Sequence, residues 1–348
     1  MEQQDREFLY ARIVSGYLRL KVSSGVIVLI KSPTVKQQYA SQEVYKDSYE
    51  EAISQNMFTE EEALELLRES GQWKPIDDKR IEQIPKDIEK LKLKIYESFN
   101  HEKTRESIRM FLRKAEEQLA KTYANKHAYN STTCEGYASY CRWNWIIEKC
   151  TFYEDDTLYD WKHSSISSVL GYYQNNIVPD SDIRDIVRND PWRSVWSSGR
   201  KSGNVFGVPA IELTQEQKNV IVWSQIYDSV QESPEAPSEE LLSDDDAFDG
   251  YLIKQRNTRK SQQNKNEIEG ELTNDKIKNS DEVFIMASDT KRIQKIESMN
   301  DDAAKGMQKS RRKKIKEAGN INHGALPDVK KSIQMDANEA FKSKMKGG

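Results

Sequence analysis

Three cysteines, with histidines on either side of two of them, are the residues whose chemistry could most readily define a site. Cys134 and Cys141 are seven residues apart, which places them on one face of a helix, and His127 and His163 flank them. A zinc site normally contains closely paired ligands such as Cys-x-x-Cys, and the sequence has no such pair. A catalytic thiol needs a base beside it, which this spacing does not indicate. The pattern favours buried cysteines that pack as small apolar side chains.

An acidic run at residues 244–250 (DDDAFDG) superficially resembles a calcium-binding loop. An EF-hand loop that began at Asp244 would need an oxygen ligand at its fifth position, where Phe248 stands, and glycine at its sixth, where Asp249 stands. Carboxylates are favourable at the positive end of a helix dipole. The run therefore predicts the acidic N-cap of a short helix after Ser243.

A basic loop at residues 197–207 contains several glycines, which suggests a phosphate-binding loop. A Walker A motif requires a lysine directly after its second glycine, and this loop has none in that register. A flexible basic loop is favoured, although it could contact a phosphate or an acidic partner. Trp192 and Trp196 precede it beside Arg193, and aromatic rings near arginines can stack on nucleic-acid bases. Their spacing of four favours two core residues on one helix face.

The strongest charge signal is a basic stretch near the C-terminus, with no acidic residue between Lys305 and Lys316. Such a stretch is typical of an arm for nucleic acid or an acidic surface, and equally of a solvated helical tail. An isolated apolar segment precedes it at residues 283–286. The candidate partner-binding residues are Arg311, Arg312, Lys313, Lys314, Lys316, Phe284, Ile285 and Met286.

No motif in the sequence indicates catalysis, so we predict a protein that is not an enzyme, without catalytic, cofactor-binding or metal-binding residues. An enzyme with a pocket of scattered residues stays open as an alternative. Its residues would be Arg142, Trp145, Glu148 and Asp160.

Composition separates a body from a tail. Hydrophobic residues make up 36% and charged residues 32% of the 348 residues, against about 45–50% and about 25% in typical globular proteins. The apolar deficit lies mainly after residue 230, where apolar surface is too scarce to offset chain entropy. The net charge of −4 opposes a general nucleic-acid or membrane-surface binder. Three cysteines, an odd number, favour a reducing compartment.

The longest apolar run, at residues 26–30, is far shorter than the roughly 20 residues of a membrane span. The polar, acidic N-terminus lacks the pattern of a signal peptide. We therefore expect a soluble protein that is neither secreted nor bound to a membrane.

The hydrophobic patterns predict a mainly α fold: a helical body with a small N-terminal β-hairpin and a largely disordered, charged C-terminal tail. Residues 8–32 are expected to form strands, with a hairpin of residues 17–22 and 26–30. Capping boxes that begin at Thr34, Thr59 and Thr132 predict helix starts, and Gly71 predicts a helix end. Apolar residues recur every three or four positions over 84–99 and 108–123, which predicts an antiparallel helical hairpin.

Further helices are expected from Thr132 to Cys150, over 166–173, near 183–187 with a stop at residues 189–191, and after the cap Thr214. Residues 254–273 are expected to be disordered. Four regions follow: a hairpin element at 1–32, a helical region at 33–130, an aromatic-rich helical region at 131–232, and at 233–348 a linker with a mostly disordered charged tail and short helices.

Four segments resemble stretches found in structural-module proteins of tailed bacteriophages. They are residues 29–34 (LIKSPT), 133–138 (TCEGYA), 189–193 (NDPWR) and 223–228 (WSQIYD). In its layout over residues 29–348 the chain is similar to a tail-assembly chaperone, a helical protein with a flexible, charged C-terminal extension.

The resemblance implies a non-enzymatic role in phage assembly, in which the helical body holds a structural partner such as a tape-measure protein or tail component. It implies no functional residue, and it places the protein in the host cytoplasm or the virion. The alternatives are a nucleic-acid-binding accessory protein that uses the basic C-terminal segment, or a structural component of the virion.

Overall fold

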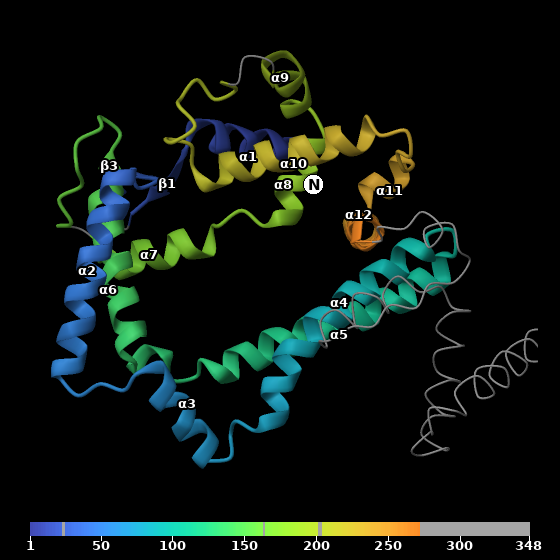
Figure 1. The fold of residues 1–348 in the computed structure, drawn as a ribbon. Coiled ribbons are helices and arrows are strands. Elements are labelled where there is room, and N and C mark those ends of the chain that lie inside the picture. The colour runs from blue at the N-terminus through green and yellow to red at the C-terminus, as the bar shows by residue number, and fades with distance from the viewer. Residues whose placement is uncertain (23–24, 163, 201–203, 272–348) are drawn as a thin grey trace, which may run out of the picture. The chain divides into compact units, whose positions relative to one another are not determined.

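The computed structural model describes residues 1–22, 25–162, 164–200 and 204–271. The chain divides into two compact units, Met1–Leu252 and a second that begins at Ile253. Helices dominate the described residues (Figure 1), which confirms the prediction of a mainly α fold with a small N-terminal hairpin. No helix among these residues is both long and apolar enough to cross a membrane.

The helices and strands follow one another along the chain as α1 (Gln3–Ser15), β1 (Tyr17–Lys21), β2 (Ile27–Lys31), α2 (Val35–Ser54), α3 (Glu60–Glu69), α4 (Pro75–Glu97), α5 (Glu102–Lys126), a short 3₁₀ turn η1 (Asn130–Thr132), α6 (Cys134–Cys150), β3 (Thr151–Tyr153), α7 (Ile166–Asn175), α8 (Asp180–Arg188), α9 (Trp192–Gly199), α10 (Gln215–Gln231), α11 (Glu239–Ser243) and α12 (Asp245–Glu271).

The predicted hairpin is confirmed. Strands β1 and β2 are antiparallel, with Tyr17 opposite Lys31, and β3 adds a third strand on the other side of β2. The expectation of strand before residue 16 is wrong, because Gln3–Ser15 form helix α1. Good helix formers fill this segment, and Gly16 ends it with a φ of 71°, which the missing side chain permits.

Helices α2 and α6 pack along each other (Figure 1). Small residues are buried on both: Ser41, Ser48 and Ala52 on α2, Cys134 and Ala138 on α6. Small side chains at such a contact let two helix axes approach closely. The pair continues from the sheet, because α2 follows β2 and α6 leads into β3.

The helix caps follow local chemistry. The boxes at Thr34 and Thr59 form as predicted, each hydroxyl accepting from the backbone N–H three residues later. The box expected at Thr132 is wrong by one residue: Thr133 is the N-cap, and its hydroxyl accepts from the N–H of Gly136. Thr132 is instead the last residue of the 3₁₀ turn, with its hydroxyl bonded to the carbonyl of Tyr129.

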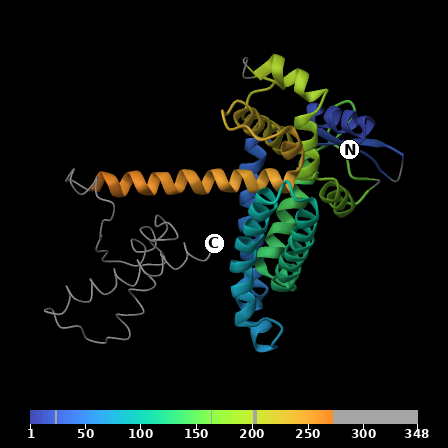
Figure 2. The ribbon, with the colours of Figure 1, turned by 90° about the vertical axis from the view of Figure 1, so that its right-hand side faces the viewer.

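Helices α4 and α5 form the predicted antiparallel hairpin, with Ile95 and Leu112 fully buried between its helices and the rest of the core. The first turns of α12 lie against α4, because a Cβ on Gly250 would stand 2.2 Å from the carbonyl oxygen of Lys92. Figure 2 shows the hairpin from a second side, with the start of α12 beside it. Only glycine fits at this crossing.

The acidic run that precedes Gly250 begins a helix, as predicted, but α12 has 27 residues and is not short. Each carboxylate of the run is paired. Its carboxylates meet cations from three helices. The pairs include Arg109–Asp246 at 3.1 Å, Arg113–Asp246 at 2.8 Å, Lys92–Asp249 at 2.7 Å, Arg184–Asp249 at 2.8 Å and Arg188–Asp245 at 2.6 Å. We call this set the acidic clasp, and it joins the start of α12 to α4, α5 and α8.

Trp192 and Trp196 are core residues, as their spacing predicts, with 1% and 5% of their surface exposed. The indole N–H of Trp192 donates to Ser224 at 2.8 Å, and that of Trp196 donates to Asp228 at 2.7 Å. Both tryptophans thus fix α9 against α10 and leave no face for a nucleic-acid base.

Helix α12 extends to Glu271, so the expectation of disorder from residue 254 onward is wrong for residues 254–271. That segment lacks an apolar face, but Lys, Arg, Gln and Glu are good helix formers and no proline interrupts them. The rest of the predicted tail lies outside the described residues.

Candidate partner-binding groove

The residues predicted to bind a partner, Phe284, Ile285, Met286, Arg311, Arg312, Lys313, Lys314 and Lys316, lie outside the described residues, as does His163. A site must therefore be sought in the helical body.

The cysteines have the character of packing residues. Cys134 is fully buried and its thiol donates to the carbonyl of Met57, 3.3 Å away. Burial raises the pKa of the Cys150 thiol to about 11, so it stays protonated at neutral pH. Within the described ranges, no group of three or more His, Cys, Asp and Glu side chains could hold a metal ion.

The scattered residues of the enzyme alternative have separate partners. Arg142 donates to the hydroxyl of Ser41 at 3.2 Å, and Glu148 pairs with the neighbouring Lys149 at 2.7 Å. Hydrogen bonds from Lys162 and Tyr153 lower the pKa of Asp160 to about 2, so it stays ionised and is a poor base.

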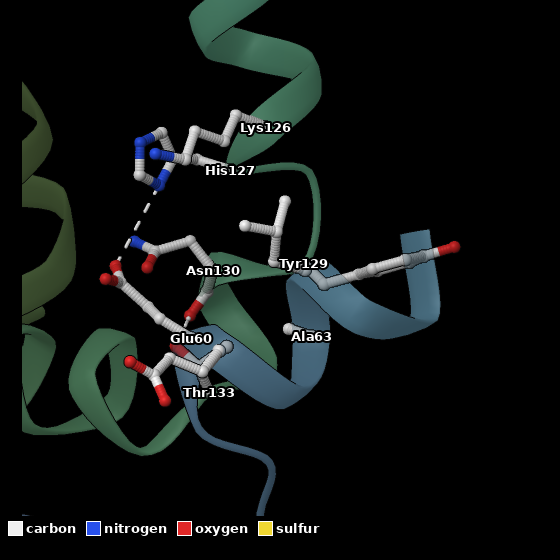
Figure 3. A pocket seen from close by; sticks show the side chains of 9 residues that line it. Glu60, Ala63, Lys126, His127, Tyr129, Asn130 and Thr133 are labelled. Carbon is white, nitrogen blue, oxygen red and sulfur yellow. Dashed lines mark hydrogen bonds and ion pairs between the residues drawn. The ribbon is translucent and has the colours of Figure 1, made fainter. Parts of the chain in front are cut away.

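A small cavity of about 150 Å³ lies between the start of α3 and the end of α5. Figure 3 shows His127 facing Glu60 across it, with a nitrogen–oxygen distance of 3.8 Å. Both side chains are more than two-fifths exposed, and exposed pairs of this kind contribute little. The cavity has the character of a surface pocket between adjoining helices.

A larger, mostly apolar groove of about 260 Å³ lies where α6, α7 and the β1–β2 hairpin meet the start of α10. Its walls include three aromatic rings, those of Tyr17, Trp143 and Tyr173. The rings of Trp143 and Tyr173 are tilted against each other, with centroids 6.5 Å apart. We call it the aromatic groove.

The rim of the aromatic groove is exposed. Ile177 has 60% of its surface exposed and Trp143 39%. Large apolar side chains gathered beside a cavity, rather than scattered singly, mark a binding surface.

An ion pair forms the polar part of the aromatic groove. The Nη2 of Arg12 donates to Glu216 at 2.7 Å and to the carbonyl of Asn176 at 2.6 Å. Burial raises the pKa of Glu216, and the attraction of Arg12 offsets this only in part. The Nε of Arg12 is buried without an acceptor. The side chains of this pair are 14% and 26% exposed, so it is only partly open to solvent.

No motif could have revealed the aromatic groove, because its residues come from six elements between positions 12 and 219. Trp143 and Tyr173 lie within helices that the sequence does predict, but their exposure becomes visible only in the fold. Arg12 and Tyr17 bracket Gly16, the turn from α1 into β1.

Comparisons of this chain with protein-family models, curated proteins and solved structures found no match.

Proposed function

We propose that this chain is a non-enzymatic assembly protein of a tailed bacteriophage that holds a helical structural protein, in the manner of a tail-assembly chaperone. Two features of the chain support this role: the resemblance of the four sequence segments and a surface feature of the helical body. The surface feature is the aromatic groove, a cavity lined by tryptophan, tyrosine and arginine side chains, with exposed apolar side chains at its rim.

The residue types of the aromatic groove support protein binding. Trp, Tyr and Arg are the side chains that most often dominate the energy of protein interfaces, and they do so where a pocket can exclude water. A helical partner presents apolar side chains every three or four residues, and one such side chain can enter a groove of this size. Ile177 and Trp143 on the rim would then cover the residues beside that anchor.

The test is capture of a partner by the full chain from a lysate of infected host cells, with nuclease present. The chain is compared with the variants Trp143→Ala and Ile177→Asp. Met110→Asp is the matched control, because Met110 is 62% exposed and Ile177 60%, but Met110 lies on α5, away from the groove.

We expect one phage structural protein to co-purify with the wild type and the control, and to be lost with both groove variants. If Met110→Asp reduces capture of the partner as much as Ile177→Asp does, the aromatic groove is not the binding site. A partner that disappears on nuclease treatment would favour the nucleic-acid-binding alternative.

A further inference from the structure

We infer that residues 254–266 of helix α12, which we call the basic arm, bind duplex DNA. Figure 2 shows α12 along its length. The basic arm is separate in sequence from the basic stretch between Lys305 and Lys316, and this binding does not depend on the role proposed for the aromatic groove. Three properties of the arm support it: its charge, its exposure around the whole helix and its lack of hydrophobic residues.

The basic arm has five cationic residues and no acidic one. The cations are Lys254, Arg256, Arg259, Lys260 and Lys265. The other eight residues of the arm are Asn, Gln, Ser and Thr. Arginine and lysine bind phosphates, and all of these polar side chains can also hydrogen-bond to base edges in the major groove. The composition therefore suits contact with both the backbone and the bases of DNA.

The basic arm is exposed on every side of the helix. Each of the eight residues from Arg256 to Gln263 is exposed, and eight residues make more than two turns. Arg256, Arg259 and Lys260 are three and four positions apart, so they share one face. Three exposed cations on one face can contact neighbouring phosphates at the same time.

The net charge of −4 for the whole chain does not prevent this contact. Electrostatic interactions between exposed charges decay over about 8 Å at physiological ionic strength. A phosphate held against the basic arm therefore interacts mainly with the cations of the arm. The carboxylates at the start of the same helix are already paired in the acidic clasp.

The dimensions of the basic arm favour duplex DNA over other nucleic acids. A helix with its side chains is about 10–12 Å across, and the major groove of B-form DNA is about 12 Å wide. The major groove of duplex RNA is too deep and narrow for side chains to read. Proteins usually hold single strands by stacking bases on aromatic rings, and the arm has no aromatic residue.

The lack of hydrophobic residues disfavours a protein or a membrane as the partner of the basic arm. Protein interfaces centre on buried aromatic and apolar anchors, and amphipathic helices enter a membrane surface through an apolar face. From Lys254 to Glu267 the helix has no hydrophobic residue. Its binding energy must come from charge and hydrogen bonds, as it does for proteins that bind the phosphates of DNA.

The first measurement is fluorescence anisotropy of a labelled DNA duplex of about 20 base pairs, two helical turns, titrated with the full chain. An RNA duplex of the same sequence is the comparison. We expect a Kd for DNA of about 10⁻⁶ M that weakens steeply with salt, and at least about tenfold weaker binding of RNA. Equal affinity for the two duplexes, or no binding of DNA at about 50 mM salt, would overturn the inference.

The variant Arg256→Gln/Arg259→Gln/Lys260→Gln removes three charges from the basic arm, and glutamine keeps the helix propensity high. It should weaken DNA binding at least about tenfold. The slope of log affinity against log salt concentration should become shallower by about 2.7, because each phosphate contact contributes about 0.9. Circular dichroism should show an unchanged helix content, and Arg256→Lys/Arg259→Lys should keep the wild-type slope because it keeps the charge.

The matched control is Arg311→Gln/Arg312→Gln/Lys313→Gln, which removes the same charge from the stretch between Lys305 and Lys316. It should bind DNA like the wild type. A loss of affinity in this control as large as that in the arm variant would overturn the inference. The result is separable from that of partner capture, because DNA binding is measured with the purified chain and capture is carried out with nuclease present. Either experiment can fail while the other succeeds.

Discussion

Replacing Gly250 with alanine should loosen the start of α12 from the helical hairpin. A Cβ at this position would stand 2.2 Å from the carbonyl oxygen of Lys92 and 2.7 Å from the Cβ of Tyr96. Ordinary contacts between such atoms begin near 3.4 Å, so α12 must move away from α4 by about 1 Å. A shift of that size stretches the hydrogen bonds of the acidic clasp beyond their normal range.

The expected cost combines opposing effects. Overpacking of this kind costs about 1–3 kcal/mol, and each weakened bond between charged groups adds up to about 1.5–3 kcal/mol. Alanine in a helix recovers about 1 kcal/mol relative to glycine. We expect Gly250→Ala to lower the free energy of unfolding by about 2–4 kcal/mol, and the melting temperature by roughly 2–4 °C for each kcal/mol.

Gly171→Ala is the matched control, because Gly171 lies within α7 and a Cβ there would meet nothing within 4 Å. It should stabilise the protein by up to about 1 kcal/mol. Urea denaturation followed by circular dichroism measures both variants. Hydrogen exchange of residues 245–252 reports whether α12 detaches locally. Wild-type stability and wild-type exchange in Gly250→Ala would refute the close crossing of α12 and α4.

Three further variants or measurements test the buried charges and thiols. Burial alone would raise the pKa of Asp228, but hydrogen bonds from Trp196, Arg193 and Arg200 outweigh burial and lower the pKa below the ordinary value of an aspartate. The ionised Asp228 therefore stabilises the fold at pH values above the ordinary pKa, and this stabilisation is lost as the pH falls through the pKa of the folded protein. Asp228→Asn should therefore lower the free energy of unfolding by about 2–3 kcal/mol at neutral pH. In urea denaturation the difference in this free energy between variant and wild type should become smaller below about pH 4. A difference that does not depend on pH would contradict this. Burial raises the pKa of Asp246 above its ordinary value even though Arg113 and Arg109 lower it, so its contribution to stability is lost as pH rises through the folded pKa. Asp246→Asn should lower the free energy of unfolding by less than about 1 kcal/mol at neutral pH, because Arg109 keeps its pair with Asp244 and Arg113 its pair with Glu116, so neither arginine is left unpaired. A loss equal to that of Asp228→Asn would be the contrary result. Cys141 is half-buried, and in the native protein it alone should react rapidly with a thiol reagent near pH 8, whereas all three cysteines should react after unfolding. The labelled positions are found by mass spectrometry. Rapid labelling of Cys134 or Cys150 in the native protein would show that they are not buried.

Local chemistry made much of this fold predictable. Thr34 and Thr59 cap their helices through residues three positions away, and the hairpin of α4 and α5 follows from its apolar period. Helix α1 was missed because its apolar residues crowd into positions 8–14 and do not form one helical stripe. Its buried residue, Ile13, packs on distant helices. Tertiary packing of this kind leaves little trace in a local pattern.

The candidate site was much less predictable. The acidic run indicated a helix start, but its six cationic partners lie on α4, α5 and α8, some 60 to 160 residues away in sequence. The aromatic groove likewise depends on which helix faces remain uncovered after packing. Sequence spacing describes one element at a time, whereas both features arise between elements.

The central position of β2 has a consequence for how the chain reaches its fold. Its neighbour β1 is the adjacent segment of chain, but its other neighbour, β3, pairs Thr151 with Ile30 across 121 residues. Closing so long a loop has a high entropic cost, and contacts of high sequence separation form slowly. Until β3 arrives, one edge of the most apolar strand in the body is open to pairing with another chain. We expect aggregation during refolding to begin at residues 27–31, and changes that slow the packing of α2 on α6 to increase it.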